Sequence, residues 1–201
     1  MRAIGDTLVL ATHNQGKLEE IAALLAELAV TVVSAASLGL PEPEETEVSF
    51  VGNARLKAHA AARQAGLVAL ADDSGICVDA LGGAPGVYTA DWAMTPTGRD
   101  FGLGMARVWR EVAASGAAPP YLAQFRCTLV LAWPDGDDRI YEGVMHGRLV
   151  WPVRGDQGHG FDPMFQPDGY DMTCGEMDRW RKNRISHRAD ACRKLVAAHF
   201  T

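Results

Sequence analysis

Apolar and polar positions follow two different periods along this chain, and together these periods predict alternating strands and helices. Residues 7–12 (TLVLAT) form a short, β-branched apolar run that is typical of a buried strand. After a polar turn, residues 18–28 place leucine and isoleucine at spacings of three and four, which predicts a helix. Residues 30–37 (VTVVSAAS) predict a second strand. The chain therefore opens with a strand, a turn, a helix and a strand.

A second helix and a third strand are predicted next. Ser49 is a typical helix-capping residue before the alanine-rich segment 50–65, and Gly66 is a typical helix stop. Residues 67–71 (LVALA) predict a strand that ends at a pair of aspartates. This strand therefore delivers two carboxylates to one end of the predicted sheet.

The second half of the chain predicts a helix, a strand pair and a long loop. We expect a helix over 99–114, then a hairpin of long strands over 123–133 and 139–150. Residues 154–171 form a long loop, and residues 176–200 become helical in their final turns. This order of elements predicts an α/β fold with a mixed sheet.

Composition excludes several classes of protein. The length of 201 residues suits one large domain or two closely joined lobes, and the formal net charge of −6 gives no footprint for duplex nucleic acid. The four cysteines form no CxxC pair, so we expect free thiols rather than a zinc site. No window approaches about 18 consecutive apolar residues, and the N-terminus is not a signal peptide. We expect a cytoplasmic protein without membrane or nucleic-acid partners.

The turn THNQGK at residues 12–17 is the first candidate for chemistry. Backbone N–H groups at a helix start attract anions, and Lys17 adds a full positive charge there. Thr12 and Asn14 add hydrogen-bonding groups suited to phosphate. A simple turn with an exposed lysine explains this segment equally well.

Acidic residues supply the second and third candidates. The loop 40–49 carries four glutamates, which indicate either a mobile solvated loop or a carboxylate donor for Mg²⁺. Asp72 and Asp73 follow a buried strand, where open α/β sheets usually bind ligands. If the strand geometry continues, they point to opposite faces, one toward a metal and substrate and the other toward a basic group or the backbone. The alternative is an Asx-turn with Ser74 and Gly75.

Two further segments complete the set. Residues 178–194 hold seven lysines and arginines against two aspartates, which indicates a local counter-charge for a polyanion or an exposed basic helix. The segment GHGFDP adds His159, Phe161 and Asp162 on a glycine-rich loop, groups that suit a nucleobase pocket. Taken together, the clusters point to a nucleoside triphosphate and to metal-activated water as the attacking group.

Several of these segments also carry a family resemblance. LATHNQGKLEEI, EETEVSFVGNA, ADDSGICVDALGGAPGVYTADWA, GHGFDPMFQPDG and EMDRWRKNRISHRADA occur in this order over residues 8 to about 192. The chain resembles the inosine/xanthosine triphosphate pyrophosphatase family, also called the Ham1-like family. The resemblance implies hydrolysis of noncanonical purine nucleotides (ITP, dITP, XTP, dXTP) to the monophosphate and pyrophosphate. It also implies Mg²⁺ dependence, a homodimer, and a single domain over 1–201 whose long mixed sheet, flanked by helices, forms two lobes around a central substrate cleft.

The resemblance further implies roles for individual residues. Asp73 matches the family's general base and metal ligand, and Glu44 matches its metal-binding glutamate. Asp72 and Asn53 fall in family motifs with supporting roles. The positions that match substrate-binding residues are Thr12, His13, Asn14, Gln15, Gly16, Lys17, Ser74, His159, Gly160, Phe161, Asp162, Lys182, His187 and Arg188.

Three positions depart from the family pattern, and two of them concern base recognition. His159 stands where phenylalanine is usual, and Phe161 replaces tyrosine or tryptophan; Gly52 also stands where glutamate is common. These changes leave open a pyrophosphatase with altered base preference, and loss of hydrolysis would leave a nucleotide sensor. Because Lys17, Glu44 and Asp73 are present, the sequence favours the enzyme.

Overall fold

The computed structural model describes residues 2–26 and 28–200. Its strands are β1 (Thr7–Leu10), β2 (Thr31–Ser34), β3 (Val68–Val78), β4 (Met94–Thr95), β5 (Gly98–Arg99), β6 (Leu122–Ala132), β7 (Asp138–Leu149) and β8 (Phe165–Pro167). Its α-helices are α1 (Gln15–Leu25), α2 (Phe50–Ala65), α3 (Phe101–Ala114), α4 (Arg179–Ile185) and α5 (His187–His199). In this part of the chain, no helix is both long enough and apolar enough to cross a membrane.

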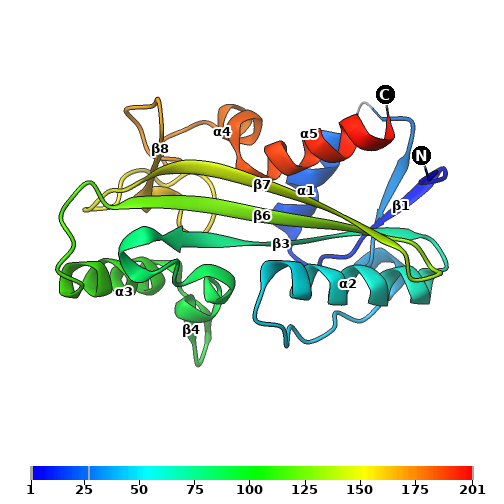
Figure 1. Ribbon diagram of the computed structural model, residues 1–201, viewed down its shortest axis with the longest axis horizontal. Helices are drawn as coiled ribbons and strands as arrows, with labels where there is room; N and C mark the ends of the chain where they lie inside the picture. The colour runs from blue at the N-terminus through cyan, green and yellow to red at the C-terminus, as the bar shows by residue number, and fades with distance from the viewer. Residues whose placement is uncertain (1, 27, 201) are drawn as a thin grey trace. The chain divides into compact units, whose positions relative to one another are not determined.

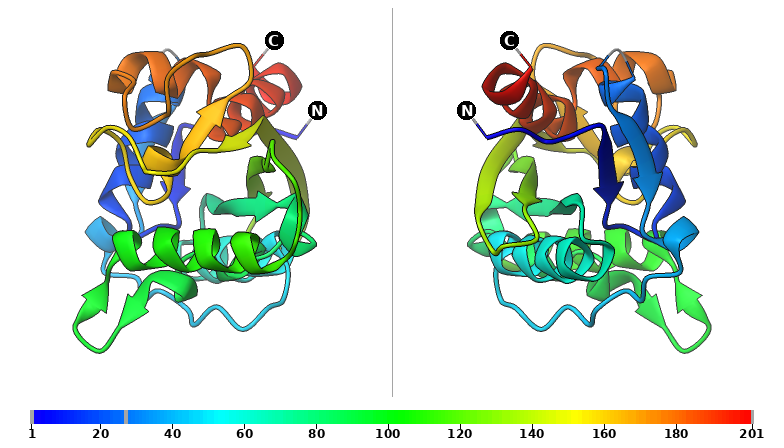
Figure 2. Two further views of the ribbon diagram at one scale, coloured as in Figure 1. Left: turned by 90° about the vertical axis from the view of Figure 1, so that its left-hand side faces the viewer. Right: turned by 90° about the vertical axis from the view of Figure 1, so that its right-hand side faces the viewer.

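The main sheet has six strands in the order β2-β1-β3-β6-β7-β8. Strand β1 pairs in parallel with both β2 and β3, whereas β7 pairs antiparallel with β8. The predicted α/β fold with a mixed sheet is therefore confirmed. The short strands β4 and β5 form a separate antiparallel pair that leads directly into α3 (Figure 2).

The chain divides into two compact units. The first unit contains the chain up to Asp73, residues Cys127–Gly143 and the chain from Arg188 onward. The second unit contains residues Ser74–Arg126 and Val144–His187. The expected arrangement as one two-lobed domain around a cleft stays a prediction.

Each strand of the first unit feeds two different cores, because successive side chains point to opposite faces of a sheet. Leu8, Leu10 and Leu70 belong to one core with α1 and α5, whereas Val9 and Ala69 belong to another with α2 (Figure 1). The α2 core is rich in alanine, whose small side chain lets this helix lie close to the sheet. The two faces of the sheet are therefore distinct environments for the polar residues that follow on β3.

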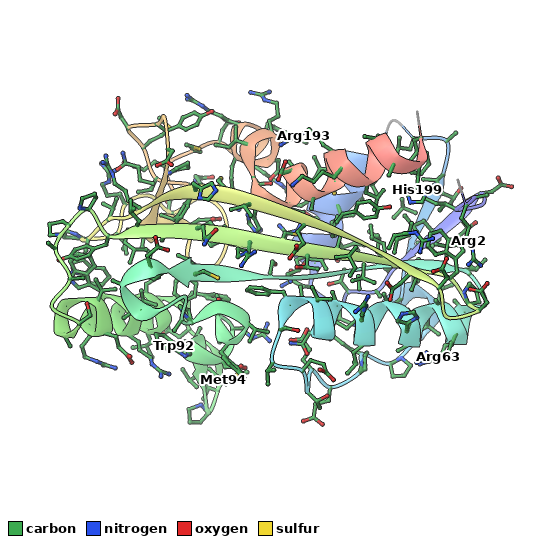
Figure 3. All side chains as sticks on the ribbon, in the orientation of Figure 1. Arg2, Arg63, Trp92, Met94, Arg193 and His199 are labelled. Atoms are coloured by element: carbon green, nitrogen blue, oxygen red, sulfur yellow. The ribbon has the colours of Figure 1, made fainter. Side chains whose placement is uncertain are left out.

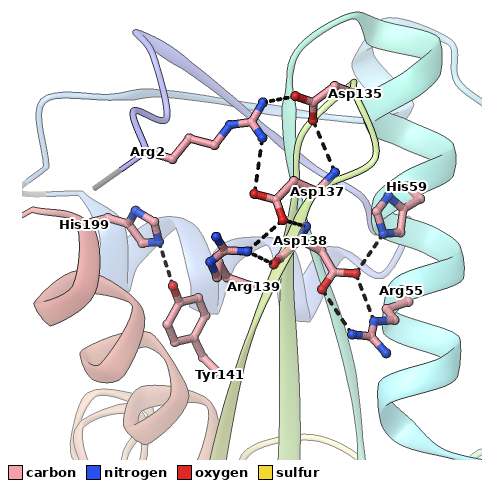
Figure 4. A network of polar contacts seen from close by, with 9 residues as sticks. All are labelled: Arg2, Arg55, His59, Asp135, Asp137, Asp138, Arg139, Tyr141 and His199. Carbon is pink, nitrogen blue, oxygen red and sulfur yellow. Dashed lines mark hydrogen bonds and ion pairs between the residues drawn. The ribbon is translucent and has the colours of Figure 1, made fainter.

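A polar network at the hairpin between β6 and β7 ties that turn to α2 (Figure 4). Asp138 accepts hydrogen bonds from Arg55 Nε at 2.9 Å and Arg55 Nη2 at 3.2 Å, and it lies 2.9 Å from His59 Nε2. Tyr141 Oη lies 2.6 Å from His199 Nε2 on α5, whose outer side also carries Arg193 (Figure 3). These contacts hold the hairpin against two helices of the same unit.

The second unit is built around α3 and the parts of β3, β6 and β7 that fall within residues 74–126 and 144–187. Its core includes Ile76, Met105, Phe125 and Phe165. Aromatic rings supply much of the contact, since the Phe125 and Phe165 ring centroids lie 4.5 Å apart. This core supports the 158–164 segment described below.

Local capping residues set both ends of α2 and the start of α1. Ser49 accepts the Gly52 N–H at 3.1 Å and begins α2, and Gly66 ends it with a φ of 66°, which confirms the predicted boundaries. Asn14 Oδ1 accepts the Lys17 N–H at 3.1 Å, so α1 begins at Gln15, earlier than the apolar pattern indicated. The cap, and not the first leucine, decides where this helix starts.

The prediction that a strand ends at the aspartate pair was wrong. Strand β3 continues through both aspartates to Val78, so they lie inside a strand and not in an Asx-turn. In the sheet β3 lies between β1 and β6, and Gly75 leaves room for a segment beside the strand, because a Cβ at this position would lie 2.3 Å from the Gly86 carbonyl oxygen. Thr89 Oγ1 also accepts the Ile76 N–H at 2.9 Å. The glycine lets a neighbouring segment approach the strand where a turn was expected.

The C-terminal region also differs in detail from the pattern. The segment 154–171 is not entirely loop, because it contains a 3-10 helix at Asp162–Met164 and strand β8. Helical structure begins at Arg179, before the final turns, since Asp178 caps α4 by accepting the Arg181 N–H at 2.9 Å. Short polar caps again set boundaries that hydrophobic periodicity did not reveal.

Candidate active site

The turn between β1 and α1 is ordered by its own polar side chains. Thr12 Oγ1 accepts the Asn14 N–H at 3.1 Å, and Asn14 in turn caps α1. Gln15 donates to Glu19 at 3.0 Å along the helix surface. Because α1 begins here, its first N–H groups and its dipole favour an anion beside the turn.

Asp72 lies in the centre of a buried charge cluster in the first unit. Its carboxylate pairs with Lys17, and Arg188 Nε donates to its Oδ2 at 3.2 Å. Cys127 Sγ donates to the same oxygen at 3.0 Å. Burial alone would raise the pKa of Asp72, but the charges of Arg188 and Lys17 outweigh it and hold this pKa well below the usual range. Asp72 therefore stays ionised and organises two cations.

Arg188 is shared between two carboxylates. Its Nε contacts Asp72, and its Nη1 forms an ion pair with Glu20 of α1. All three side chains are buried. These contacts occupy two nitrogens of the guanidinium that the sequence assigned to purine recognition.

Asp73 points to the opposite face of β3 and meets a different cation. Its Oδ1 lies 3.7 Å from Lys57 Nζ, and both side chains are less than one-tenth exposed. Burial raises the pKa of Asp73 to about 6, while Lys57 and Lys17 act in the opposite direction. The expected division of the aspartate pair between two faces is confirmed. Near neutral pH this carboxylate is ionised yet easily protonated, as a general base requires.

Sequence reasoning missed Lys57, although a signal was present. The buried face of α2 carries Asn53, Ala54, Lys57, Ala58 and Ala61, at helical spacings of three and four. A lysine on such a face requires a charged partner. Burial opposes its charge, but Asp73 and Glu45 together raise its pKa. A cation was therefore predictable here, but its partners were not.

The acidic loop reaches this cluster through Glu45. Lys57 forms an ion pair with Glu45, so one ammonium group is shared by the carboxylates of Glu45 and Asp73. Glu44 is exposed one residue earlier on the same loop. Asn53 Oδ1 accepts the Glu47 N–H at 3.0 Å and anchors the end of the loop. The structure thus brings the loop to Asp73 and adds Glu45 to the candidate metal ligands.

These carboxylates have the chemistry of ligands for a divalent cation such as Mg²⁺. Within residues 2–26 and 28–200, no group of three or more His, Cys, Asp or Glu side chains forms a ready metal site. Mg²⁺ needs only one or two protein carboxylates when phosphate oxygens and water complete its octahedron. Asp73 and Glu45 of the loop already share the ammonium group of Lys57. These two carboxylates are the donor set that such a site requires.

His13 is turned toward the acidic loop. Its Nε2 lies 3.1 Å from the Leu40 carbonyl oxygen, and its Nδ1 lies 3.5 Å from Glu42 Oε2. The ring therefore connects the turn at 12–17 to the loop at 40–42.

The second unit holds the remaining predicted residues. Lys182 Nζ donates to Asp162 Oδ2 at 2.6 Å, and the His159 N–H donates to the same oxygen at 2.6 Å. Gly158 has a φ of 80°, and a Cβ there would lie 2.2 Å from Asp162 Oδ2. The buried Asp162–Lys182 pair therefore holds this loop in place. The loop can approach the Asp162 carboxylate so closely only because residue 158 is glycine.

The aromatic residues of this unit divide between core and surface. Phe161 is 2% exposed and packs edge-to-face on Phe101, with ring centroids 6.0 Å apart, so it belongs to the core. The His159 side chain is exposed beside the half-buried Gly160, and Ser74 is half-buried on β3. His187 is buried and stacks on Phe125 at 5.1 Å. Of the ring-bearing residues predicted in this loop, His159 alone presents its ring at the surface.

This chain is similar to known proteins over almost its whole length. The family model described as the Ham1 family matches residues 8–198. A dITP/XTP pyrophosphatase of Ruegeria pomeroyi is 65% identical over 98% of this chain and 96% of its own length. The Rhodospirillum centenum protein of the same name is 55% identical, over 99% and 97%. The solved structure of a HAM1 protein from Coxiella burnetii matches with a TM-score of 0.88 and 34% identity, over 96% and 97% of the two chains.

Proposed function

Because this chain belongs to the Ham1 family, we infer that it is a nucleoside triphosphate pyrophosphatase that hydrolyses noncanonical purine nucleotides. The proposed substrates are ITP, dITP, XTP and dXTP, and the products are the monophosphate and pyrophosphate. The observation that carries this proposal is the pair Asp72 and Asp73 on one strand. One carboxylate organises Lys17 and Arg188, and the other meets Lys57 and the acidic loop.

Asp73 is the proposed general base. It accepts a proton from the water that attacks the α-phosphorus, and Lys57 beside it keeps the carboxylate ionised near neutral pH. Asp73 with Glu44 or Glu45 would hold Mg²⁺. When bound, this ion lowers the pKa of a coordinated water and neutralises triphosphate charge.

Lys17 and the turn at 12–17 are proposed to bind the phosphates. Asp72 holds the Lys17 ammonium beside the helix start, which spares the substrate the entropic cost of ordering a long side chain. As the α–β phosphate bond breaks, Lys17 and the first N–H groups of α1 stabilise the negative charge that develops on the pyrophosphate. The network around Asp72 therefore contributes by positioning.

Purine recognition is proposed for residues 159–162, Lys182, His187 and Arg188. His159 offers a ring for stacking, and the Asp162–Lys182 pair fixes the loop that carries it. Hypoxanthine and xanthine share a 6-oxo acceptor, which donors such as Lys182, His187 and Arg188 are proposed to read. Adenine presents an amino group there, so a donor-lined pocket disfavours it.

One assay tests this function against both alternatives. The protein is incubated with Mg²⁺ and ITP, XTP, dUTP, ATP or GTP, and pyrophosphate release is measured, with Asp73→Asn as the inactive control. Hydrolysis confined to ITP and XTP supports the proposal. Efficient hydrolysis of dUTP, ATP or GTP indicates the altered base preference, and binding without hydrolysis indicates a sensor.

We further propose that the active form is a homodimer whose ligand is a small nucleotide and not nucleic acid. Large apolar side chains are exposed in the second unit, including Tyr88, Met94 and Leu103 at 47%, 55% and 58%. Exposed apolar side chains mark an interface when they form one contiguous patch. Sedimentation equilibrium measures the mass, and Leu103→Glu is expected to shift a dimer toward the monomer. The cytoplasmic location stays a prediction.

A further inference from the structure

The loop that carries Glu44 and Glu45 has few internal supports. Its first residue is held where the Leu40 N–H donates to the Ala35 carbonyl at 3.0 Å, and its end is held by Asn53. Between these anchors lie mostly exposed residues without helix or strand. A segment of this kind opens easily unless side chains from outside it hold it in place.

The structure gives two outside contacts different roles. Lys57 holds the loop through the Glu45 carboxylate. A bound metal ion would compete with Lys57 for this carboxylate. His13 instead contacts the Leu40 carbonyl and Glu42, and it uses neither Glu44 nor Glu45. The His13 contacts therefore survive when the ligand carboxylates turn toward a metal.

The chemistry of the ring decides which contact matters more. The Leu40 carbonyl can only accept, so His13 Nε2 donates to it, and the neutral ring suffices. The 3.5 Å contact with Glu42 adds an ion pair only when the ring is protonated, and both side chains are substantially exposed there. The carbonyl hydrogen bond is thus the constant part of the connection.

Two prolines restrict the backbone of the loop between Leu40 and Glu44. Pro41 and Pro43 flank Glu42, and each proline fixes its own φ near −65°. A hydrogen bond at Leu40 therefore restricts the path of the chain toward Glu44. His13, Glu42 and both prolines also line one hollow in the first unit, together with Lys57. The histidine thus lies beside the cluster whose geometry it would set.

We propose that His13 is a positioning residue that fastens the acidic loop to the phosphate-binding turn and thereby presents the loop glutamates for Mg²⁺. This inference rests on the proposed function and deepens it, because it assigns His13 a role apart from direct substrate contact. Loss of the ring frees the loop and weakens metal binding, while Asp73 and Lys57 remain in place.

The first test needs neither metal nor substrate. Glutamyl endopeptidase cleaves native protein at the loop glutamates in proportion to the population of the open loop. His13→Ala is expected to accelerate this cleavage about fivefold, the effect of losing one hydrogen bond. His13→Gln keeps an N–H donor for Leu40 and is expected to stay near the wild-type rate. His146→Ala, at an exposed histidine of β7, is the matched control for the substitution.

The second test is the Mg²⁺ concentration that gives half-maximal pyrophosphate release from ITP. His13→Ala is expected to raise it about fivefold, and Glu42→Gln is expected to raise it less. Unchanged cleavage in His13→Ala overturns the proposal whatever the activity is. Faster cleavage with an unchanged Mg²⁺ requirement also overturns it, because the loop would then be held for another purpose. Failure of the wild type to hydrolyse ITP overturns the proposed function, and the cleavage result still decides whether His13 holds the loop.

Discussion

Lys57 and Asp73 lie 3.7 Å apart between Nζ and Oδ1, with both side chains nearly inaccessible to water. The cation that faces the proposed base thus comes from the middle of α2 and not from the turn at 12–17. Burial raises the pKa of Asp73, and the charge of Lys57 is the largest of the effects that oppose this rise.

Lys57→Met is therefore expected to shift the acidic limb of the pH–rate profile upward by about one unit, because Asp73 loses its nearest cation. Turnover of ITP near neutral pH falls with it, and Lys57→Arg, which keeps the charge, retains most of the wild-type profile. The measurement is pyrophosphate release at saturating Mg²⁺ between pH 5 and 9. An unmoved acidic limb in Lys57→Met would show that Lys57 does not control the ionisation of Asp73.

The ionised Asp73 carboxylate is also expected to lower the free energy of unfolding. Its folded-state pKa of about 6 lies above the ordinary value of 3.8, so its contribution declines as pH rises from 4 to 6 and stays low above 6. Asp73→Asn should raise the free energy of unfolding by about 2 kcal/mol at pH 7 without metal, and this gain should vanish near pH 3. Urea unfolding at the two pH values measures the difference. A variant that is equally stabilised at both pH values contradicts the raised pKa.

Metal and nucleotide should stabilise the protein through Asp73 and one loop glutamate. Mg²⁺ with a non-hydrolysable ITP analogue at a hundredfold excess over Kd is expected to raise the free energy of unfolding by about 3 kcal/mol, and therefore to raise Tm. Asp73→Asn should abolish most of this gain. Glu44→Gln and Glu45→Gln are compared in the same thermal melts. The variant that loses the Mg²⁺-dependent part identifies the ligand, and retention of the full gain in all three variants excludes these carboxylates.

The Asp162–Lys182 pair should stabilise the second unit. Both side chains are at most 7% exposed, and removal of one partner leaves a buried charge. Asp162→Asn is expected to cost about 3–5 kcal/mol of unfolding free energy. Glu111→Gln breaks the exposed pair with Arg107 in the same unit and should cost less than about 1 kcal/mol. Equal costs for the two variants would show that burial does not amplify the Asp162–Lys182 pair.

His159→Phe tests the proposed stacking residue. Phenylalanine presents more apolar ring area than imidazole, so KM for ITP should fall about threefold while kcat stays nearly unchanged. Steady-state kinetics with ITP and XTP measure both constants, and His159→Ala should shift KM in the opposite direction. A KM that ignores both substitutions would place the base away from this side chain.

Local patterns predicted much of the fold. Ser49 and Gly66 bounded α2 correctly, and the mixed sheet followed from the order of the elements. The end of β3 was mispredicted because its cause lies elsewhere in the chain. Gly75 lets Gly86 and Thr89 approach the strand, and no window of sequence around Asp72 contains that information.

The sequence by itself predicted that Asp72 and Asp73 point to different faces if the strand continues through them, since the two-residue period of a strand is a local property. Only the tertiary structure decided which partners each carboxylate meets. Cys127 and Arg188 reach Asp72 across 55 and 116 residues of chain, and Lys57 reaches Asp73 from α2. Such pairings depend on how helices pack against each face of the sheet, and packing depends on the whole chain.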